Sequence, residues 1–126
     1  MPTERILCVD DDEGTCELLT AMLSFSDLEA ISAPSVDEAL RKIKSEKFSL
    51  YILDSQMPGI AGLSLCEQIR ELDKDTPIII FSGHARQKDL DAAMRAGANA
   101  YLVKPDSSNL VDTVKRLLRA ARDTSL

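Results

Sequence analysis

The chain has 126 residues, of which 44% are hydrophobic and 29% are charged, and its formal net charge is -6. Its length fits one domain that can form a core without disulfides or a structural metal. Broad nucleic-acid-binding surfaces are basic, so the acidic balance argues against direct nucleic-acid binding by this domain. We expect a single domain over residues 1–126, with a core at about 5–119 and a C-terminal tail at 120–126.

The first half of the chain alternates predicted strands with predicted helices. Ile6–Val9 is a continuous apolar run that is too short for a helix, which is typical of a strand covered on both faces. Apolar residues at helical spacing follow over Thr15–Ser26, and Glu29–Ala33 mixes polar and apolar residues as an edge strand does. A second helix is predicted over Ser35–Ser45, because its first serine and Glu38 form the sequence signature of a capping box.

The second half of the chain repeats this alternation. Three more apolar runs predict buried strands, at Leu50–Leu53, Ile78–Phe81 and Ala100–Val103. Apolar residues at helical spacing predict three more helices, over Leu63–Leu72, Gln87–Ala96 and Leu110–Ala121. Gly97 is a natural left-handed residue at the end of the second of these, and Ser107 or Ser108 is the expected N-terminal cap of the third.

Five strand–helix units in succession predict an α/β fold with a doubly wound parallel sheet. Right-handed crossovers put helices on both faces of such a sheet. Ligands bind these sheets at the carboxyl ends of the strands, near the point where the strand order reverses. The residues that follow the predicted strands are therefore the first candidates for a functional site.

Charged and polar residues follow four of the predicted strands. The acidic run Asp10–Glu13 follows the first strand, Asp54 the third, Ser82 the fourth and Lys104 the fifth. Because parallel strands end at one edge of the sheet, these side chains are expected to converge there. Each also has a structural interpretation on its own, as a turn acid, a turn serine or a loop lysine. Their coincidence at matching strand ends favours a functional site.

The carboxylates of Asp10, Asp11 and Asp54 would repel one another at this edge unless a cation compensates their charge. Mg2+ prefers a few carboxylates together with waters and phosphate oxygens. A metal and the ammonium of Lys104 could neutralise a transferred phosphoryl group while a carboxylate serves as nucleophile. For Asp12 and Glu13 a structural role at a helix N-terminus is the favoured interpretation.

The three cysteines, Cys8, Cys16 and Cys66, show no CxxC spacing and are predicted to be reduced thiols in the core. No stretch reaches the ~18 apolar residues of a membrane span. The N-terminal segment Met1–Arg5 does not have the pattern of a signal peptide. We therefore expect a cytoplasmic protein with no membrane partner.

Four segments together resemble the receiver domain of two-component response regulators. They are Ile6–Asp12, Leu53–Gly59, Phe81–Gly83 and Tyr101–Pro105, and the resemblance extends from about Arg5 to Arg119. No segment is decisive alone, but four in order with matching strand–helix spacing are highly specific. The resemblance implies the flavodoxin-like fold of chemotaxis regulators, with strand order 2-1-3-4-5 and five helices.

The resemblance also implies an acceptor and a metal site. Asp54 would be the phosphorylation site. Asp11 and Asp54 would bind Mg2+ (or Mn2+) directly, together with the backbone carbonyl of Gln56, and Asp10 would act through a bound water. Lys104 would pair with the carboxylate and later with the phosphoryl group. These roles follow from the family and are expectations for this chain.

The resemblance further implies a switch. Ser82 would move to meet the phosphoryl group, and Tyr101 would rotate inward as it does so. Gln56 and His84 occupy the two positions that tune dephosphorylation in the family. The Lys104–Pro105 bond is expected to be cis, since X–Pro bonds are the ordinary place for a cis peptide.

The function implied is that of a phosphoacceptor signalling switch. A sensor histidine kinase or a phosphotransfer protein would donate a phosphoryl group from a phosphohistidine to Asp54. The modified domain would shift between inactive and active conformations and bind a downstream protein or a fused output domain differently. Such a domain is not a conventional enzyme, although it catalyses its own phosphorylation and autodephosphorylation. The resemblance also allows a phosphorylation-dependent dimer.

Two alternatives stay open at this point. A small phosphatase of the haloacid-dehalogenase type also uses an aspartate nucleophile and Mg2+, and Asp10–Asp12 loosely matches its paired aspartates. However, Glu13 and Gly14 break the usual continuation, and the chain has no room for a cap domain. The other alternative is a degenerate receiver that only binds partners, although every chemical position of the family is filled here.

Overall fold

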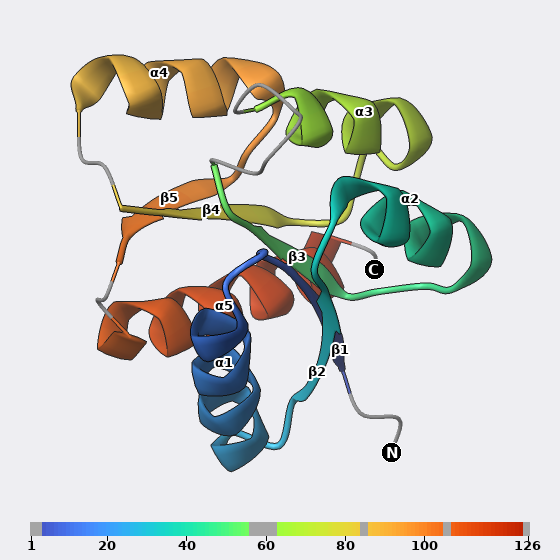
Figure 1. The fold of residues 1–126 in the computed structure, drawn as a ribbon, viewed down its shortest axis with the longest axis vertical. Helices are drawn as coiled ribbons and strands as arrows, with labels where there is room; N and C mark the ends of the chain where they lie inside the picture. The colour runs from blue at the N-terminus through green and yellow to red at the C-terminus, as the bar shows by residue number, and fades with distance from the viewer. Residues whose placement is uncertain (1–3, 56–62, 84–85, 105–106, 125–126) are drawn as a thin grey trace.

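The structure is a computed structural model that describes residues 4–55, 63–83, 86–104 and 107–124. Strands and helices alternate along these residues without exception (Figure 1). The strands are β1 (Arg5–Val9), β2 (Glu29–Ala33), β3 (Leu50–Leu53), β4 (Ile78–Ser82) and β5 (Ala100–Val103). The helices are α1 (Glu13–Phe25), α2 (Val36–Ser45), α3 (Ser64–Leu72), α4 (Gln87–Ala96) and α5 (Ser107–Thr124).

The five strands form one parallel sheet in the order β2-β1-β3-β4-β5. This order confirms the predicted doubly wound, flavodoxin-like fold and puts β2 at an edge, as its mixed composition indicated. The register pairs Val9 with Leu53 and Ser82 with Val103, so the carboxyl ends of neighbouring strands lie level with one another. The residues that follow these strands are thereby brought to one edge.

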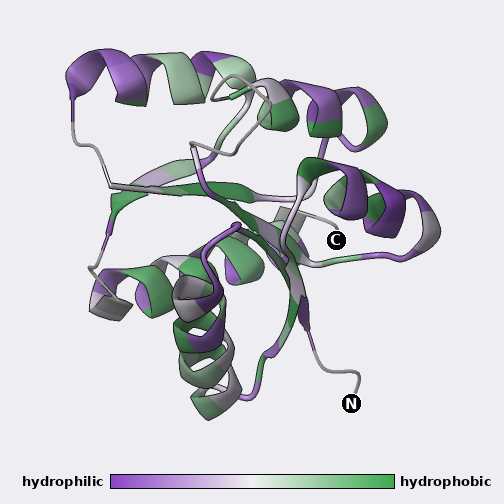
Figure 2. Cartoon of the chain, viewed as in Figure 1, coloured by the Kyte–Doolittle hydropathy of each residue, from purple (hydrophilic) through white to green (hydrophobic). Residues whose placement is uncertain are grey.

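Helices cover both faces of the sheet. Helices α1 and α5 lie on one face and α2, α3 and α4 on the other (Figure 1). Successive strand side chains point to opposite faces, so β1 contributes Ile6 and Cys8 to the core on the α1/α5 face and Leu7 and Val9 to the core on the other. Figure 2 shows the result, with apolar strands in the middle and hydrophilic residues on the outer surfaces of the helices.

The helix ends confirm most of the predicted caps. Ser35 accepts a hydrogen bond from the backbone N–H of Glu38, as the capping-box signature indicated. Gly97 ends α4 with a φ of 111°, in the left-handed region that favours glycine. The prediction for α5 was wrong, because Ser107 and Ser108 lie inside its first turn. That turn contains polar residues that the apolar periodicity does not detect.

The cysteines confirm a further expectation. Cys8, Cys16 and Cys66 are free and buried, and burial raises the pKa of the Cys8 thiol to about 12. A thiol with so high a pKa stays protonated at neutral pH and is a poor nucleophile. No helix in the described part of the chain is both long and apolar enough to cross a membrane.

The edge of the sheet opposite the carboxyl ends of the strands, where β4 and β5 begin, is held by Arg70 in the last turn of α3. Its guanidinium donates hydrogen bonds to the backbone carbonyls of Asp73, Thr76 and Gly97 and to the side chain of Asn99. One charged side chain thus joins the loop before β4 to the loop before β5. A Cβ on Gly97 would lie 2.6 Å from Cγ of Arg70, so the close approach also requires glycine.

Asp73 forms a second connection at this edge. The hydroxyl of buried Tyr51 donates to Oδ2 of Asp73 at 2.9 Å, and the backbone N–H groups of Asp75 and Thr76 donate to Oδ1. Burial raises the pKa of Asp73, but the bonds from Thr76, Tyr51 and Asp75 outweigh burial and lower the pKa overall. The ionised form of Asp73 therefore stabilises the fold.

We expect Asp73→Ala to lower the free energy of unfolding by about 2 kcal/mol at neutral pH, because the Tyr51 hydroxyl loses this acceptor. The contribution of the charge is fully present above the ordinary aspartate pKa of 3.8 and is lost as the pH falls through the lowered value. Urea titrations of both proteins between pH 7 and pH 3 should show the difference narrowing at the acid end. The matched control is Asp75→Ala, which removes an exposed carboxylate two residues away. A difference that does not change with pH would contradict this account.

Candidate functional site

The backbone of the site continues the hydrogen bonding of the sheet. The N–H of Asp10 donates to Ala33, that of Asp54 to Val9, and that of Lys104 to Ser82, at 3.2, 2.9 and 2.7 Å. Each residue that follows a strand is therefore held by the strand beside it. The side chains of Asp10, Asp54 and Lys104 meet at the carboxyl edge because this ladder extends one residue past the strands.

Lys104 lies between two carboxylates from different strands. Its Nζ is 2.8 Å from Oδ2 of Asp10 and 3.6 Å from Oδ1 of Asp54. The side chain of Asp10 is only 4% exposed and that of Asp54 9%, so solvent screens these pairs weakly. Nζ also lies 5.8 Å from the ring centroid of Phe81, within the range of a cation–π contact.

These partners hold Lys104 in its charged form. Burial lowers the pKa of Lys104, but the hydrogen bond and charge of Asp10, and then the charge of Asp54, outweigh burial and raise it. The stability that comes from this pairing is present below the ordinary lysine pKa of 10.5 and is lost only as the pH rises through the raised value. At neutral pH the site therefore contains a fixed ammonium group.

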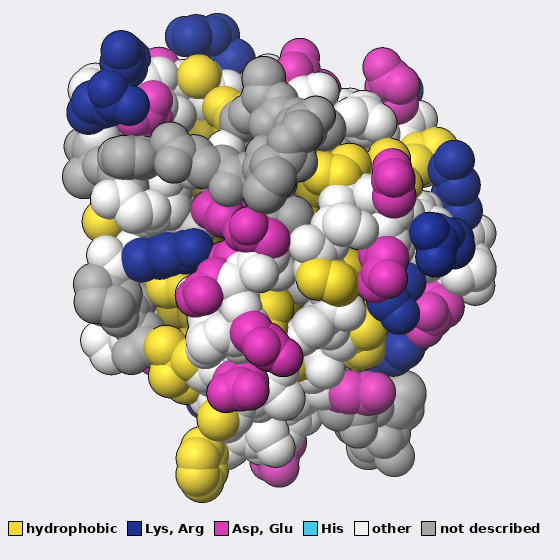
Figure 3. Space-filling view, in the orientation of Figure 1, with side chains coloured by type: hydrophobic (Ala, Val, Ile, Leu, Met, Phe, Trp, Pro, Cys, Tyr) yellow, Lys and Arg dark blue, Asp and Glu magenta, His cyan; other side chains and the backbone are white. Residues whose placement is uncertain are grey.

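Three carboxylates form a cluster beside this lysine. Oxygen atoms of Asp10, Asp11 and Asp54 all lie within 4.8 Å of one another, from a buried, an exposed and an intermediate residue respectively. Figure 3 shows acidic side chains gathered near the middle of the face in view, next to a basic one. Oxygen donors that converge in this way, open to solvent on one side, fit a hard divalent cation that keeps some of its waters.

Hydrogen bonds in the turn between β1 and α1 orient the carboxylates of this cluster. Asp12 is the N-cap of α1, and its Oδ2 accepts hydrogen bonds from the backbone and the hydroxyl of Thr15. The bond from the Thr15 hydroxyl is the main cause that lowers the pKa of Asp12. The N–H of Asp12 donates in turn to Oδ1 of Asp10 at 2.9 Å, and Glu13 lies in the first turn of α1. The structural interpretation of Asp12 and Glu13 is therefore confirmed.

Two residues that were not predicted to belong to the site also touch it. The Cys16 thiol donates to the backbone carbonyl of Asp10 at 3.4 Å, which joins α1 to the acidic turn. Ser55, directly after Asp54, forms a hydrogen bond of 2.6 Å with the hydroxyl of Ser82. A hydroxyl next to the acidic residue was the available signal for Ser55, whereas only tertiary packing brings Cys16 to Asp10.

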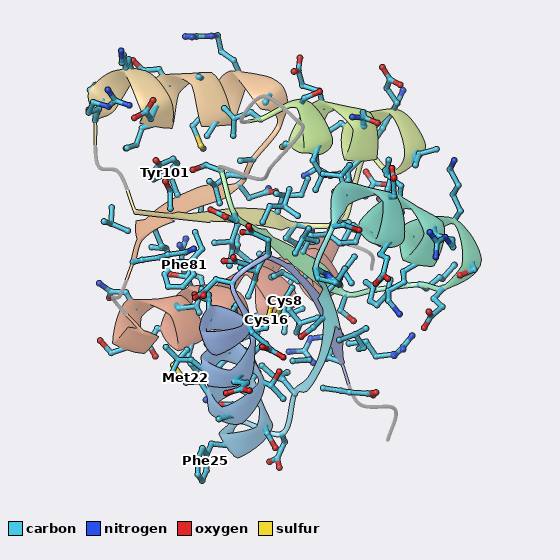
Figure 4. The ribbon with its side chains drawn as sticks, viewed as in Figure 1. Cys8, Cys16, Met22, Phe25, Phe81 and Tyr101 are labelled. Atoms are coloured by element: carbon cyan, nitrogen blue, oxygen red, sulfur yellow. The ribbon has the colours of Figure 1, made fainter. Side chains whose placement is uncertain are left out.

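Ser82 and Tyr101 lie on one side of the sheet. Ser82 is fully buried, and Tyr101 packs against the core cluster on the side of α2, α3 and α4. Figure 4 shows Tyr101 between β5 and α4, with Phe81 on the side of α5. Gln56, His84 and the Lys104–Pro105 bond lie partly or wholly outside the described residues, so these expectations stay predictions.

Comparison with known proteins agrees with this geometry. The family model for the response regulator receiver domain matches residues 6–115. The chain belongs to this family. Among solved structures, a CheY-like receiver domain protein from Methanospirillum hungatei matches with a TM-score of 0.92 at 30% identity, over 98% of this chain and 99% of that one. TrrA from Thermotoga maritima, in complex with Mg2+-BeF, matches with a TM-score of 0.83 at 37% identity, over 91% and 99%.

Several curated relatives of this receiver domain are about twice its length. The transcriptional regulatory protein PrrA of Mycobacterium tuberculosis is 36% identical over 122 residues, which are 96% of this chain and 52% of PrrA. The chain thus spans about half the length of that relative. Receiver domains of this family bind Mg2+ at an acidic pocket and are not conventional enzymes. In this chain Asp10, Asp11 and Asp54 form an acidic cluster. The family match does not support the phosphatase alternative.

The position of Lys104 generates a prediction about the cation. Removing its charge with Lys104→Met should raise the affinity for Mg2+ roughly tenfold or more, because the ammonium repels a cation near the same carboxylates. Isothermal titration calorimetry at fixed ionic strength measures this change. Lys44→Met is the matched control, since Lys44 is exposed in the last turn of α2. Equal or weaker Mg2+ binding by Lys104→Met would show that the lysine does not compete with the metal.

Proposed function

We propose that this receiver domain accepts a phosphoryl group on Asp54 from a phosphohistidine. The P–N bond of the donor breaks as a P–O bond forms with a carboxylate oxygen of Asp54. The observation that supports the proposal most strongly is that three carboxylates and an ammonium from three strands meet at one edge. Phosphoryl transfer needs such positioning and charge compensation more than it needs covalent chemistry from the protein.

The proposed metal ligands are Asp11, Asp54 and the backbone carbonyl of Gln56, with Asp10 acting through a water. A bound Mg2+ or Mn2+ would neutralise charge on the phosphoryl oxygens and bring them close to the acceptor. The Asp10 carboxylate also has partners within the protein, since it accepts hydrogen bonds from Lys104 and from the backbone of Asp12. These bonds fix the carboxylate before any cation or phosphate arrives.

Lys104 has two successive partners in this proposal. In the unmodified protein its Nζ contacts Asp10 at 2.8 Å and Asp54 at 3.6 Å. A phosphoryl group on Asp54 brings more negative charge and more acceptor oxygens to the same place. The ammonium would follow that charge with a small movement, because it already lies between the two carboxylates. Gln56 and His84 are the residues that we propose to tune the reverse reaction with water.

The conformational response would pass through Ser82 and Tyr101. Ser82 ends β4 and is bound through its carbonyl to the N–H of Lys104, and Tyr101 lies in the neighbouring strand β5. A hydroxyl that moves toward the phosphoryl group leaves space on the side of Tyr101 and α4. This biases an existing equilibrium between inactive and active states and changes the surface of α4, β5 and α5.

The proposed partners follow from this chemistry. The donor would be a sensor histidine kinase or a phosphotransfer protein, and the reader a downstream protein, a fused output domain or a second copy in a phosphorylation-dependent dimer. The relative PrrA is a transcriptional regulatory protein about twice as long as this chain, which suits a receiver that controls an attached or separate output. We further propose that residues 1–126 act as a single receiver domain in the cytoplasm.

Acetyl phosphate with Mg2+ tests the proposed acceptor directly. Wild-type protein should gain the mass of one phosphoryl group, whereas Asp54→Asn should gain none, because the amide is not a nucleophile for this transfer. Removing Mg2+ with EDTA should slow modification of the wild type at least tenfold, since the charge on the phosphate is then uncompensated. Intact-protein mass spectrometry after acid quenching measures each product.

Asp12→Asn is the matched control, because it removes a carboxylate from the same turn that caps α1. It should be modified like the wild type. Modification of Asp54→Asn at the wild-type rate would exclude Asp54 as acceptor. A wild type that is never modified, by acetyl phosphate or by a phosphorylated kinase, would favour the degenerate receiver that only binds partners.

A further inference from the structure

The hydrogen bond between Ser55 and Ser82 adds a component to the switch. We propose that Ser55 is a positioning residue that holds the Ser82 hydroxyl in the inactive position and so raises the threshold for activation. The Oγ atoms of the two serines are 2.6 Å apart, and Ser82 is fully buried. This inference rests on the proposed function, because the inactive and active states are those of the Asp54 switch.

The alternation of side chains along the strands puts this bond on the side of the sheet away from Lys104. Phe81 belongs to the core cluster of α1 and α5, and Lys104 lies over its ring. The next residue of β4, Ser82, therefore points to the other face, where Tyr101 packs and lies near α4 (Figure 4). Ser55 meets Ser82 on that face.

Asp54 points the other way. Its carboxylate contacts Lys104 and clusters with Asp10, so a phosphoryl group on Asp54 belongs to the same side as the ammonium. For Ser82 to donate to that group, its Oγ has to turn from Ser55 toward Asp54. Side chains occupy staggered rotamers, so this turn moves Oγ out of hydrogen-bonding distance of Ser55. The two bonds of Ser82 thus compete.

The size of the effect is that of one neutral hydrogen bond. A net contribution of about 1 kcal/mol corresponds to roughly a fivefold change in the equilibrium between the two positions of Ser82. A ligand shifts such an equilibrium only by the difference in its affinity for the two states. Losing the Ser55 hydroxyl should therefore lower the concentration of phosphoryl analogue needed to reach the active state.

Beryllium fluoride at fixed Mg2+ serves as the analogue, followed by the backbone amide shifts of β4 and β5 in two-dimensional NMR spectra. We expect Ser55→Ala to reach half-saturation at roughly a threefold to tenfold lower beryllium fluoride concentration than wild type. Ser55→Thr keeps the hydroxyl and should restore the wild-type value. Ser45→Ala is the control. It removes an exposed hydroxyl of α2 that donates to the backbone carbonyl of Arg41, and it should leave the midpoint unchanged. An unchanged or higher midpoint for Ser55→Ala overturns the proposal.

A second measurement tests the bond between Ser55 and Ser82 without any phosphoryl analogue. Scalar couplings that report χ1 of Ser82 should show the same rotamer in wild type and in Ser55→Thr, and a different distribution of rotamers in Ser55→Ala. Identical couplings in all three proteins overturn the proposal. If wild type and Asp54→Asn both ignore beryllium fluoride while these couplings change as expected, the proposed function fails and the role of Ser55 in holding Ser82 stands.

Discussion

The ammonium of Lys104 offsets the charge of Asp10, a carboxylate whose side chain is only 4% exposed. An unpaired charge at that depth would cost several kcal/mol, so the site depends on bringing together two residues 94 positions apart. The parallel sheet does this, because β5 ends level with β4 and the ladder continues through Lys104 to Ser82. The ion pair therefore depends on the order of the strands, which brings the carboxyl ends of β1 and β5 to one edge.

The charged residues of the site and Tyr101 lie on opposite faces of the sheet. Asp10, Asp54 and Lys104 cluster with Phe81 on the side of α1 and α5, whereas Tyr101 packs on the side of α4. Strands with side chains that alternate between faces let a change at one face reach the other within a single residue step. Phe81 and Ser82 are neighbours in β4, and their side chains point to opposite faces. In the proposed switch, the buried Ser82 hydroxyl at the end of β4 would respond to charge on one face and alter packing on the other.

Local sequence was sufficient for most of the fold and for part of the site. Buried strands are continuous apolar runs, and the caps at Ser35 and Gly97 have local signatures, so both could be predicted. The start of α5 was missed because its first turn is polar and contributes no periodicity. The bond between Ser55 and Ser82 could not be predicted, because its geometry depends on how β3 and β4 pair across 27 positions. Sequence identifies which residues reach the edge and leaves undetermined which of them touch.

Different kinds of bond hold the two edges of the sheet at which the strands begin and end. At the edge where β4 and β5 begin, Arg70 and Asp73 bind mainly backbone groups. At the carboxyl edge, Lys104 and Ser82 bind side chains, which a phosphoryl group on Asp54 would replace in the proposed switch. Stability can therefore be concentrated at one edge while the other keeps exchangeable bonds. The proposed switch would use that difference, because bonds between side chains can be exchanged for bonds to a phosphoryl group while the backbone bonds stay in place.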